Sequence, residues 1–314
     1  MKNRQENIRK MDDISSLVRM DSPEEVFKEA AHTLGLFVPS EMFSRLAKVF
    51  EHTVALYRGR IPGYRECNTG FHDLRHTTDV FLAMSRLLHG MSIAGCSLPD
   101  DMVEPTMAAA LMHDTGYIQR TDDDHGTGGQ YTLAHISRSA DYSLNYLPNA
   151  GFTDSETGLV ANMIMATSVT VEFPRLNLAG SAEMRAGKTL FISDLIGQMA
   201  DRIYLEKLLF LYKEFMEANL PQYKSEEDLL EKTLDFYRNI WKKIIDEAEY
   251  DTQHMRAHFR VRWGDDRDLY TRAIQNNMAY LSRILTEHAG ERYREHLKRE
   301  GLVRKLTELE GKGL

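Results

Sequence analysis

The chain is poor in cysteine and has no long uninterrupted run of apolar residues. Its two cysteines, Cys67 and Cys96, do not form a C-x-x-C pair, which excludes a redox motif and a zinc site built from thiolates. Free thiols of this kind are typical of a reducing cytoplasm. No stretch approaches the roughly eighteen consecutive apolar residues of a membrane-spanning helix. The charged first residues also lack the apolar core of a signal peptide, so we predict a cytoplasmic protein.

An excess of positive charge is also lacking. The 39 lysine and arginine residues are outnumbered by 47 acidic residues, which gives a formal net charge of −8. An acidic chain has no general electrostatic attraction for long nucleic acids or anionic membranes. We therefore expect a small-molecule partner, and an anionic one such as a nucleotide or phosphoester could bind if metal ions supply positive charge locally. The sequence leaves the oligomeric state open.

Alternating strand patterns and repeats of fixed period are nearly absent, and the 3.6-residue rhythm of helices dominates. The cap Ser22-Pro23-Glu24-Glu25 opens the first clear helix. We predict an all-α bundle with helices at residues 23–36, 40–60, 71–90, 104–117, 131–147, 154–167 and 182–217, and a long helical remainder after about 225. The predicted organisation is an N-terminal helical segment (1–60), a core (61–220) and C-terminal helices (221–314) in the same globular unit.

The stretch FHDLRHTTDV, residues 71–80, contains His72 and His76 four residues apart. In a helix this spacing places both imidazoles on one face. Imidazole is a metal ligand and carries protons near neutral pH. Taken alone, such a pair also fits ordinary surface or core positions, so further ligands have to be found before it indicates a site.

Three acidic or imidazole side chains occur where the sequence is otherwise apolar. His113 and Asp114 are adjacent in AALMHDTGY, and Asp194 lies in GKTLFISDLIGQMADR. A buried carboxylate without a partner is costly, so these acids require a cation, a metal or strong hydrogen-bond donors. One divalent ion bound by His76, His113, Asp114 and Asp194 would satisfy them all. Three separate helices would then converge on the ion, as in other metal centres of helix bundles.

The ordered set His76, His113-Asp114 and Asp194 resembles the H…HD…D signature of the HD-domain metal-dependent phosphohydrolase superfamily, over about residues 68–202. Within that superfamily, FHDLRHTTDV is similar to the YHNxxHAxDV segment of class I cyclic nucleotide phosphodiesterases. The stretch ANMIMATSV, residues 161–169, is similar to their I-x-A-T-D stretch. The resemblance implies a helical HD-domain bundle, with additional C-terminal helices in this chain.

The same resemblance implies roles for individual residues. Asp114 would bridge two divalent ions, with Zn, Mn, Fe, Co or Ni in the tighter site and Mg or Mn in the weaker one. His72 would be the general acid that protonates the leaving oxygen. His135 would be a ligand of the second ion, or else a histidine on a helix surface. A metal-bound hydroxide would hydrolyse a cyclic nucleotide or a similar small phosphodiester.

Substrate contacts are less well defined by the sequence. Lys188 and Arg202 flank Asp194 and are candidates for phosphate contacts, with surface salt bridges as the alternative. Gln275 is a candidate for the glutamine that binds the purine, or a polar surface residue. Ser168 replaces an acid of the phosphodiesterase pattern, which leaves the base undefined. A nucleotidase or nucleoside triphosphate hydrolase, a catalytically silent nucleotide sensor, and a metal-free helical scaffold remain alternatives.

Overall fold

The structure is a computed structural model that describes residues 14–304 and 306. Within these residues the fold is all-α, as predicted, and β-structure is limited to two isolated bridges. The start of the predicted N-terminal segment and the end of the predicted C-terminal segment lie outside the described residues. The helices are α2 (Pro23–Leu34), α3 (Leu46–Tyr57), α4 (Leu74–Ile93), α5 (Asp100–Met112), α6 (His135–Ala150), α7 (Asp154–Ile164), α8 (Gly180–Ala200), α9 (Tyr204–Glu217), α10 (Glu226–Asp246), α11 (Thr252–Trp263) and α12 (Leu269–Glu287).

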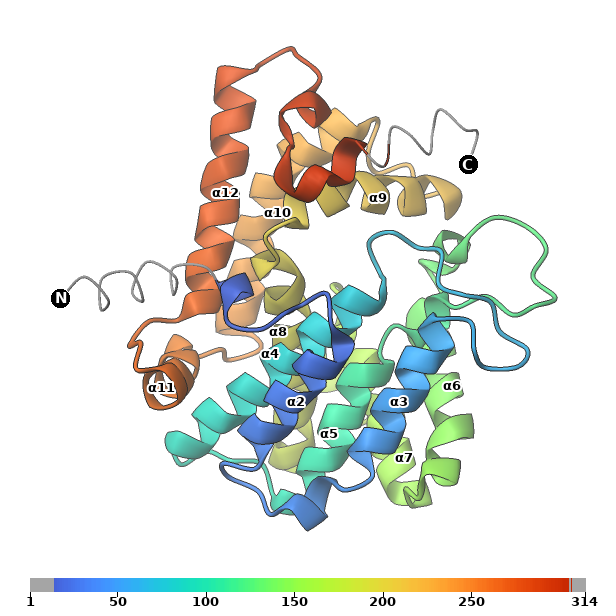
Figure 1. Cartoon of the computed structure of the whole chain (residues 1–314), viewed down its shortest axis with the longest axis vertical. Coiled ribbons are helices and arrows are strands. Elements are labelled where there is room, and N and C mark those ends of the chain that lie inside the picture. Colours follow the sequence, from blue (N-terminus) through green and yellow to red (C-terminus); the bar gives the residue numbers. More distant parts are fainter. Residues whose placement is uncertain (1–13, 305, 307–314) are drawn as a thin grey trace.

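Helices α4 and α8 lie at the centre of the molecule and pack against each other (Figure 1). Helices α2, α5 and α11 pack on α4, and α12 packs on α8. In the view of Figure 1, α9, α10 and α12 form the upper part, whereas α3, α6 and α7 form the lower part. None of the helices in the described part of the chain combines the length and apolar composition needed to cross a bilayer.

Side-chain caps fix where two of the helices begin. Ser22 accepts a hydrogen bond from the backbone N–H of Glu25, with Pro23 at the first helical position, which confirms the predicted cap of α2. Helix α4 begins later than predicted, because the side chain of Asp73 is its N-cap and accepts from the N–H of His76 at 2.9 Å. His72 therefore precedes the helix. The prediction that His72 and His76 share one helical face is wrong.

Several other helix boundaries also differ from the prediction by a few residues, and two of them bear on the site. Helix α5 ends at Met112, so His113 is its C-cap and Asp114 lies in the turn that follows. The predicted helix 182–217 is divided into α8 and α9, because the backbone of Asp201 is extended. The sequence pattern did not reveal these breaks.

One cluster of buried apolar side chains joins all parts of the bundle. It includes members from each of the three predicted segments, for example Val26, Phe81 and Ile274. The segment boundaries at 60 and 220 stay predictions. Burial of these side chains supplies the main driving force that holds α4 and α8 together in the interior.

Close helix packing leaves no room for a side chain at Gly90. A Cβ added there would lie 1.9 Å from the carbonyl oxygen of His254 at the start of α11. Helix α11 can approach α4 only because this position is glycine.

We expect Gly90→Ala to destabilise the fold by about 1–3 kcal/mol, the usual cost of overpacking, despite the better helix propensity of alanine. Chemical denaturation measures the free energy of unfolding. The matched control is Gly158→Ala in α7, where an added Cβ meets nothing within 4 Å, and this variant should be slightly more stable than the parent. Equal stability of the two variants would contradict the close approach of α11.

Candidate metal centre

Four side chains that the sequence selects meet in the interior. The Nε2 atom of His76 lies 3.1 Å from Oδ2 of Asp114 and 3.3 Å from Oδ1 of Asp194. The Nε2 atom of His113 lies 3.2 Å from the same Asp114 oxygen, 3.7 Å from the same Asp194 oxygen and 3.2 Å from Nε2 of His76. The structure thus brings together the four predicted ligands, three of which form a group that could hold a metal ion.

Three helices of the bundle position these four side chains. His76 lies in the first turn of α4, His113 and Asp114 follow the end of α5, and Asp194 lies in α8. The Nδ1 atom of His113 is 2.9 Å from the carbonyl oxygen of Ala110, three residues earlier. A hydrogen bond from Nδ1–H to this carbonyl leaves Nε2 of His113 free to bind a cation.

The spacing of these atoms fits a metal ion. Donors bound at about 2.0–2.2 Å to one ion end about 3–3.5 Å apart in octahedral or tetrahedral arrangements, close to the observed separations of 3.1–3.7 Å. The Oδ2 atom of Asp114 is buried and lies close to the Nε2 atoms of His76 and His113, but it accepts no hydrogen bond of regular geometry among the described residues. A buried carboxylate oxygen of this kind is satisfied by a cation. Two imidazoles and two carboxylates suit an ion of intermediate hardness.

The charges of the cluster are strongly coupled. Burial alone would raise the pKa of Asp194, but hydrogen bonds from His113 and His76 lower it to about 2. The pKa of Asp114 is also lowered, because His113 outweighs the effect of burial. Conversely, burial would lower the pKa of His76, but Asp114 and Asp194 raise it to about 9. The two buried carboxylates are therefore stabilised only by nearby positive charge, which either protonated imidazoles or a metal ion can supply.

Asp114 presents its other oxygen to a further histidine. The Oδ1 atom of Asp114 is 3.7 Å from Nε2 of His135, on the opposite side of the carboxylate from the atom shared by His76 and His113. The Nδ1 atom of His135 is 2.7 Å from the carbonyl oxygen of Thr132, which again leaves Nε2 free. His135 therefore directs an available nitrogen toward the second oxygen of Asp114, and its side chain is largely buried.

His72 lies beside the cluster and is bound by a residue that the sequence did not suggest. Its Nδ1 atom is 2.6 Å from Oε2 of Glu214, a buried residue of α9. The other oxygen of Glu214 accepts from the backbone N–H of Phe71. Because Glu214 holds Nδ1, Nε2 is the nitrogen of His72 that remains for other partners. Contacts between residues 142 positions apart leave no local sequence signal, so Glu214 was not predicted.

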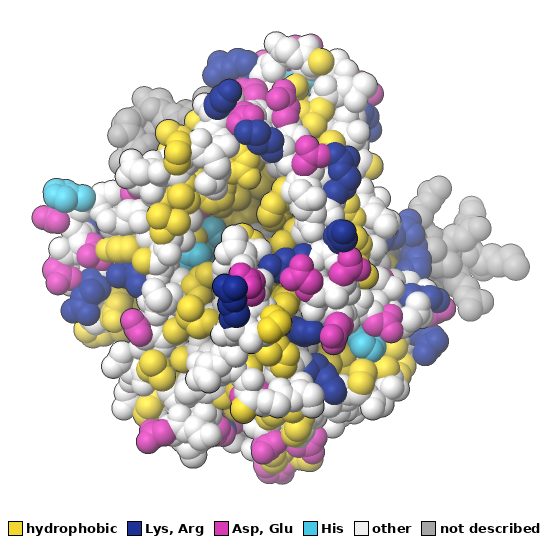
Figure 2. Space-filling view, turned by 180° about the vertical axis from the view of Figure 1, so that it is seen from behind, with side chains coloured by type: hydrophobic (Ala, Val, Ile, Leu, Met, Phe, Trp, Pro, Cys, Tyr) yellow, Lys and Arg dark blue, Asp and Glu magenta, His cyan; other side chains and the backbone are white. Residues whose placement is uncertain are grey.

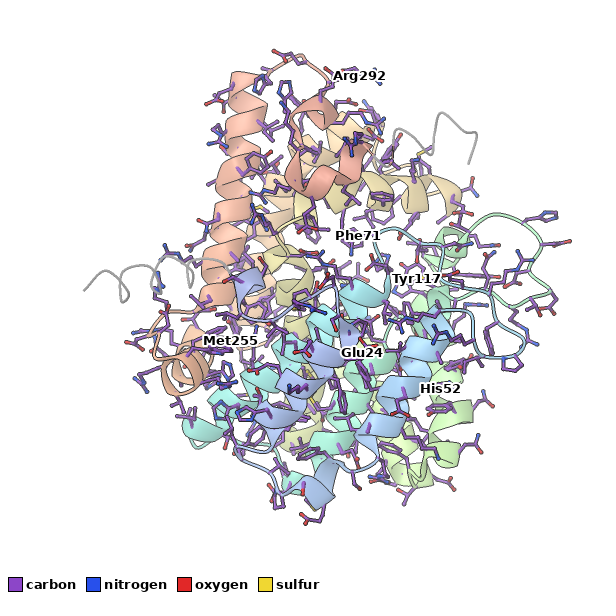
Figure 3. All side chains as sticks on the ribbon, viewed as in Figure 1. Glu24, His52, Phe71, Tyr117, Met255 and Arg292 are labelled. Atoms are coloured by element: carbon purple, nitrogen blue, oxygen red, sulfur yellow. The ribbon has the colours of Figure 1, made fainter. Side chains whose placement is uncertain are left out.

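Tyr117 packs against two of these histidines, whose rings also lie 5.9 Å from each other between centroids. Its ring stacks on that of His72 at 4.2 Å between centroids and on that of His135 at 4.4 Å. In Figure 3, the labelled Phe71 and Tyr117 lie near the middle of the view, below α9 and α10. Tyr117 thereby fixes the separation of the two imidazoles. Figure 2 shows a hollow in the opposite face of the molecule, with hydrophobic side chains along its walls and histidine side chains at its edge.

Helix α9 supports the cluster through two further contacts. The buried Lys207 donates to Asp73 at 2.8 Å, so the residue that caps α4 is itself held from α9. Glu217 accepts from the backbone N–H and the hydroxyl of Thr127, in the loop of residues 121–130. The same helix therefore holds the start of α4, the ring of His72 and this loop.

The three predicted substrate contacts do not join the cluster. Lys188 forms an ion pair with Glu249 at 2.8 Å and lines a different cavity. Arg202 is exposed after the end of α8, where its carbonyl oxygen accepts from Arg299. Gln275 is exposed on α12, whereas its neighbour Asn277 is buried and donates to backbone carbonyls. Their proximity to Asp194 in sequence, or their place in a helix, did not determine which way they face.

The comparison with family profiles identifies this chain as a member of the Npun_R2479-like family, with a match over residues 61–258. The matched region includes every residue of the cluster, His72, His135 and Glu214. The description of the family names no reaction, ligand or partner. A search among curated proteins found no match, and neither did a search among solved structures.

We expect the stability of the metal-free protein to depend on pH in two steps. The raised pKa of His76, about 9 against 6.5, contributes stability below pH 6.5 that is lost as the pH rises through 9. The lowered pKa of Asp194, about 2 against 3.8, contributes stability above pH 3.8 that is lost as the pH falls toward 2. Thermal melting in chelator should therefore give the highest midpoint between these steps.

The matched variants are His76→Asn, which should reduce the alkaline step and leave the part due to His113, whose pKa the same two carboxylates raise, and His125→Asn, which should keep the full step because His125 is exposed in the loop. A midpoint that stays constant from pH 6.5 to 9.5 in the parent protein would contradict the charge coupling.

Proposed function

We propose that this protein is a metal-dependent phosphohydrolase of the HD-domain type, and that its substrate is a cyclic nucleotide or a similar small phosphodiester. The observation that carries the proposal is the convergence of His76, His113, Asp114 and Asp194 on one buried point. The same arrangement places a partnered histidine, His72, beside that point. The resemblance in the sequence to class I cyclic nucleotide phosphodiesterases supplies the substrate class.

The two oxygens of Asp114 support a centre with two divalent ions. One oxygen faces His76 and His113, and the other faces His135. Asp114 would bridge the ions, with His76, His113 and Asp194 completing the tighter site and His135 contributing to the weaker one. When bound, such ions neutralise phosphoryl charge and lower the pKa of bound water to about 7. They would also allow a chain with net charge −8 to hold an anionic substrate.

His72 is suited to the role of general acid. Its Nδ1–H donates to the buried carboxylate of Glu214 at 2.6 Å, which fixes the orientation of the imidazole ring. Its Nε2 atom can then carry the proton that the leaving alkoxide requires. The ring centroid of His72 lies 5.7 Å from that of His76, so the acid is close to the metal ligands without being one of them.

We also propose a cytoplasmic location. The structure leaves the thiols of Cys67 and Cys96 free, as a reducing compartment would. A small nucleotide, rather than a long nucleic acid or a membrane, is the proposed partner.

Activity assays with and without chelator test the reaction class. Hydrolysis of bis(p-nitrophenyl) phosphate with added Mn²⁺ supports the phosphodiesterase. Hydrolysis restricted to p-nitrophenyl phosphate would instead indicate a nucleotidase-like monoesterase, and bound metal without any hydrolysis would indicate a nucleotide sensor. A panel of cyclic nucleotides then identifies the base.

We expect His72→Ala to lower turnover by about 10²–10⁴, the usual contribution of general acid catalysis, while the metal content stays near that of the parent. Inductively coupled plasma mass spectrometry of the purified variant gives the metal content, and the diester assay gives the rate. The control is His125→Ala in the exposed loop, which should change neither quantity. Parallel loss of metal and activity in His72→Ala would show that His72 is a ligand.

We expect Asp114→Asn to lose both metal ions, because its carboxylate faces both groups of histidines. The comparison variant is His135→Asn, which should keep the tighter ion and lose the weaker one. Equilibrium dialysis against Mn²⁺ counts the sites in each protein. Full occupancy in Asp114→Asn would refute the bridging role.

A further inference from the structure

A second cavity lies at the far end of the central helix pair. Helices α4 and α8 run in opposite directions, because Gly197 packs on Val80 whereas Thr189 contacts Met91. Along α8, at about 1.5 Å per residue, Lys188 is about 9 Å from Asp194. The cavity has a volume of about 240 Å³ and lies between α4, α8 and the turn from α10 to α11. None of the metal-cluster residues lines it.

The wall of this cavity is divided into an apolar and a cationic part. Four apolar side chains come from three different segments of the chain, and they are Leu87, Met91, Ile192 and Ala248. The cations Arg185 and Lys188 line the same cavity, together with the imidazole of His254, whose pKa is lowered by burial, and the carboxylate of Glu249. An organic molecule with an apolar body and a charged head has the complementary character.

The cations are incompletely neutralised. The guanidinium of Arg185 donates through Nη1 to the carbonyl oxygens of Cys96 and Ser97, at 3.1 and 3.4 Å, and makes no ion pair with a carboxylate among the described residues. Lys188 is largely buried, and its partner Glu249 has a side chain that is 75% exposed. The hydroxyl of the cavity residue Tyr250 is already bound by Asp268 at 2.8 Å. Positive charge therefore predominates on the polar part of the wall.

Two features of the backbone shape this cavity: the glycine at position 90 and the positive φ of Glu249. Gly90 allows α11 to approach α4, which places the imidazole of His254 against Cys96 at 3.3 Å between Nε2 and Sγ. Glu249 has a positive φ of 64°, a conformation that costs energy for a residue with a side chain. Glu249 lies at the rim of the cavity, where its largely exposed side chain pairs with Lys188, while Ala248 and Tyr250 line the cavity beside it.

We propose that this cavity is a second ligand site, separate from the metal centre, that binds a small organic anion. The apolar body of the ligand packs on Leu87, Met91 and Ile192, and its phosphate, phosphonate or carboxylate head is bound by Arg185 and Lys188. Because α4 and α8 also carry His76 and Asp194, an occupied cavity would stabilise the same helix pair that forms the metal centre.

Cys96 provides a reporter for occupancy. Its half-buried thiol lies in the cavity wall. Cys67 is an internal control, because burial raises the pKa of its thiol to about 12 and so suppresses the reactive thiolate.

The experiment measures the rate at which iodoacetamide alkylates Cys96, by peptide mass spectrometry, in the presence of phenylphosphonate. A phosphoesterase cannot hydrolyse the carbon–phosphorus bond of this probe. We expect phenylphosphonate to slow alkylation at least about tenfold at saturation, and neutral benzyl alcohol to have no effect. Benzoate in a parallel series distinguishes a carboxylate head from a phosphate-like head.

Arg185→Gln and Lys188→Gln should each raise the phenylphosphonate concentration for half-protection about tenfold, because each removes a charge-assisted hydrogen bond. The matched control is Arg238→Gln on the exposed face of α10, which should leave protection unchanged. Absence of protection at about 10 mM, or equal protection in the Arg185→Gln/Lys188→Gln double variant, would overturn the proposal. The readout requires no turnover, so it is independent of the proposed hydrolysis.

Discussion

The burial of two carboxylates, Asp114 and Asp194, against two imidazoles is the constraint on which the rest of the structure depends. Neither acid could remain in the interior without positive charge nearby. The helices that supply the charge and the acids, α4, α5 and α8, are those packed most centrally in the bundle. Protons on His76 and His113 can provide that charge, and so can a divalent ion. The observed spacing of donor atoms fits the ion, and an ion would also satisfy the buried Oδ2 atom of Asp114, which accepts no hydrogen bond of regular geometry within the described part of the chain.

Helix α9 contacts both the proposed general acid and the start of the helix that carries a proposed metal ligand. Glu214 binds the ring of His72, while Lys207 binds the N-cap of the helix that carries His76. The two residues lie two turns apart on one helix, so any shift of α9 would move the proposed acid and the proposed ligand together. Glu217 on the same helix holds the loop at Thr127. The geometry of the site therefore rests on a helix outside the motif that first indicated it.

The sequence predicted the site where a charged residue occurs in an apolar segment. It did not predict side-chain positions that depend on packing between distant segments. Acids in apolar surroundings predicted that Asp114 and Asp194 would meet, and the all-α fold followed from periodicity. The position of His72 was mispredicted because Asp73 is the N-cap of α4. The helix therefore begins after His72. Glu214 could not be predicted, since its partner lies 142 residues away. Lys188 was expected near the metal because of Asp194, but the direction of a side chain around α8 depends on the helices packed there.

X-ray absorption spectroscopy of the purified protein loaded with one equivalent of Zn²⁺ tests the central claim most directly. The account predicts a first shell of nitrogen and oxygen donors at about 2.0–2.2 Å that includes two imidazoles. The spectrum should contain no sulfur donor, because Cys67 and Cys96 take no part in the cluster. Zinc that remains hydrated without imidazole scattering, or that is bound through sulfur, would contradict the claim that this buried cluster is a metal centre.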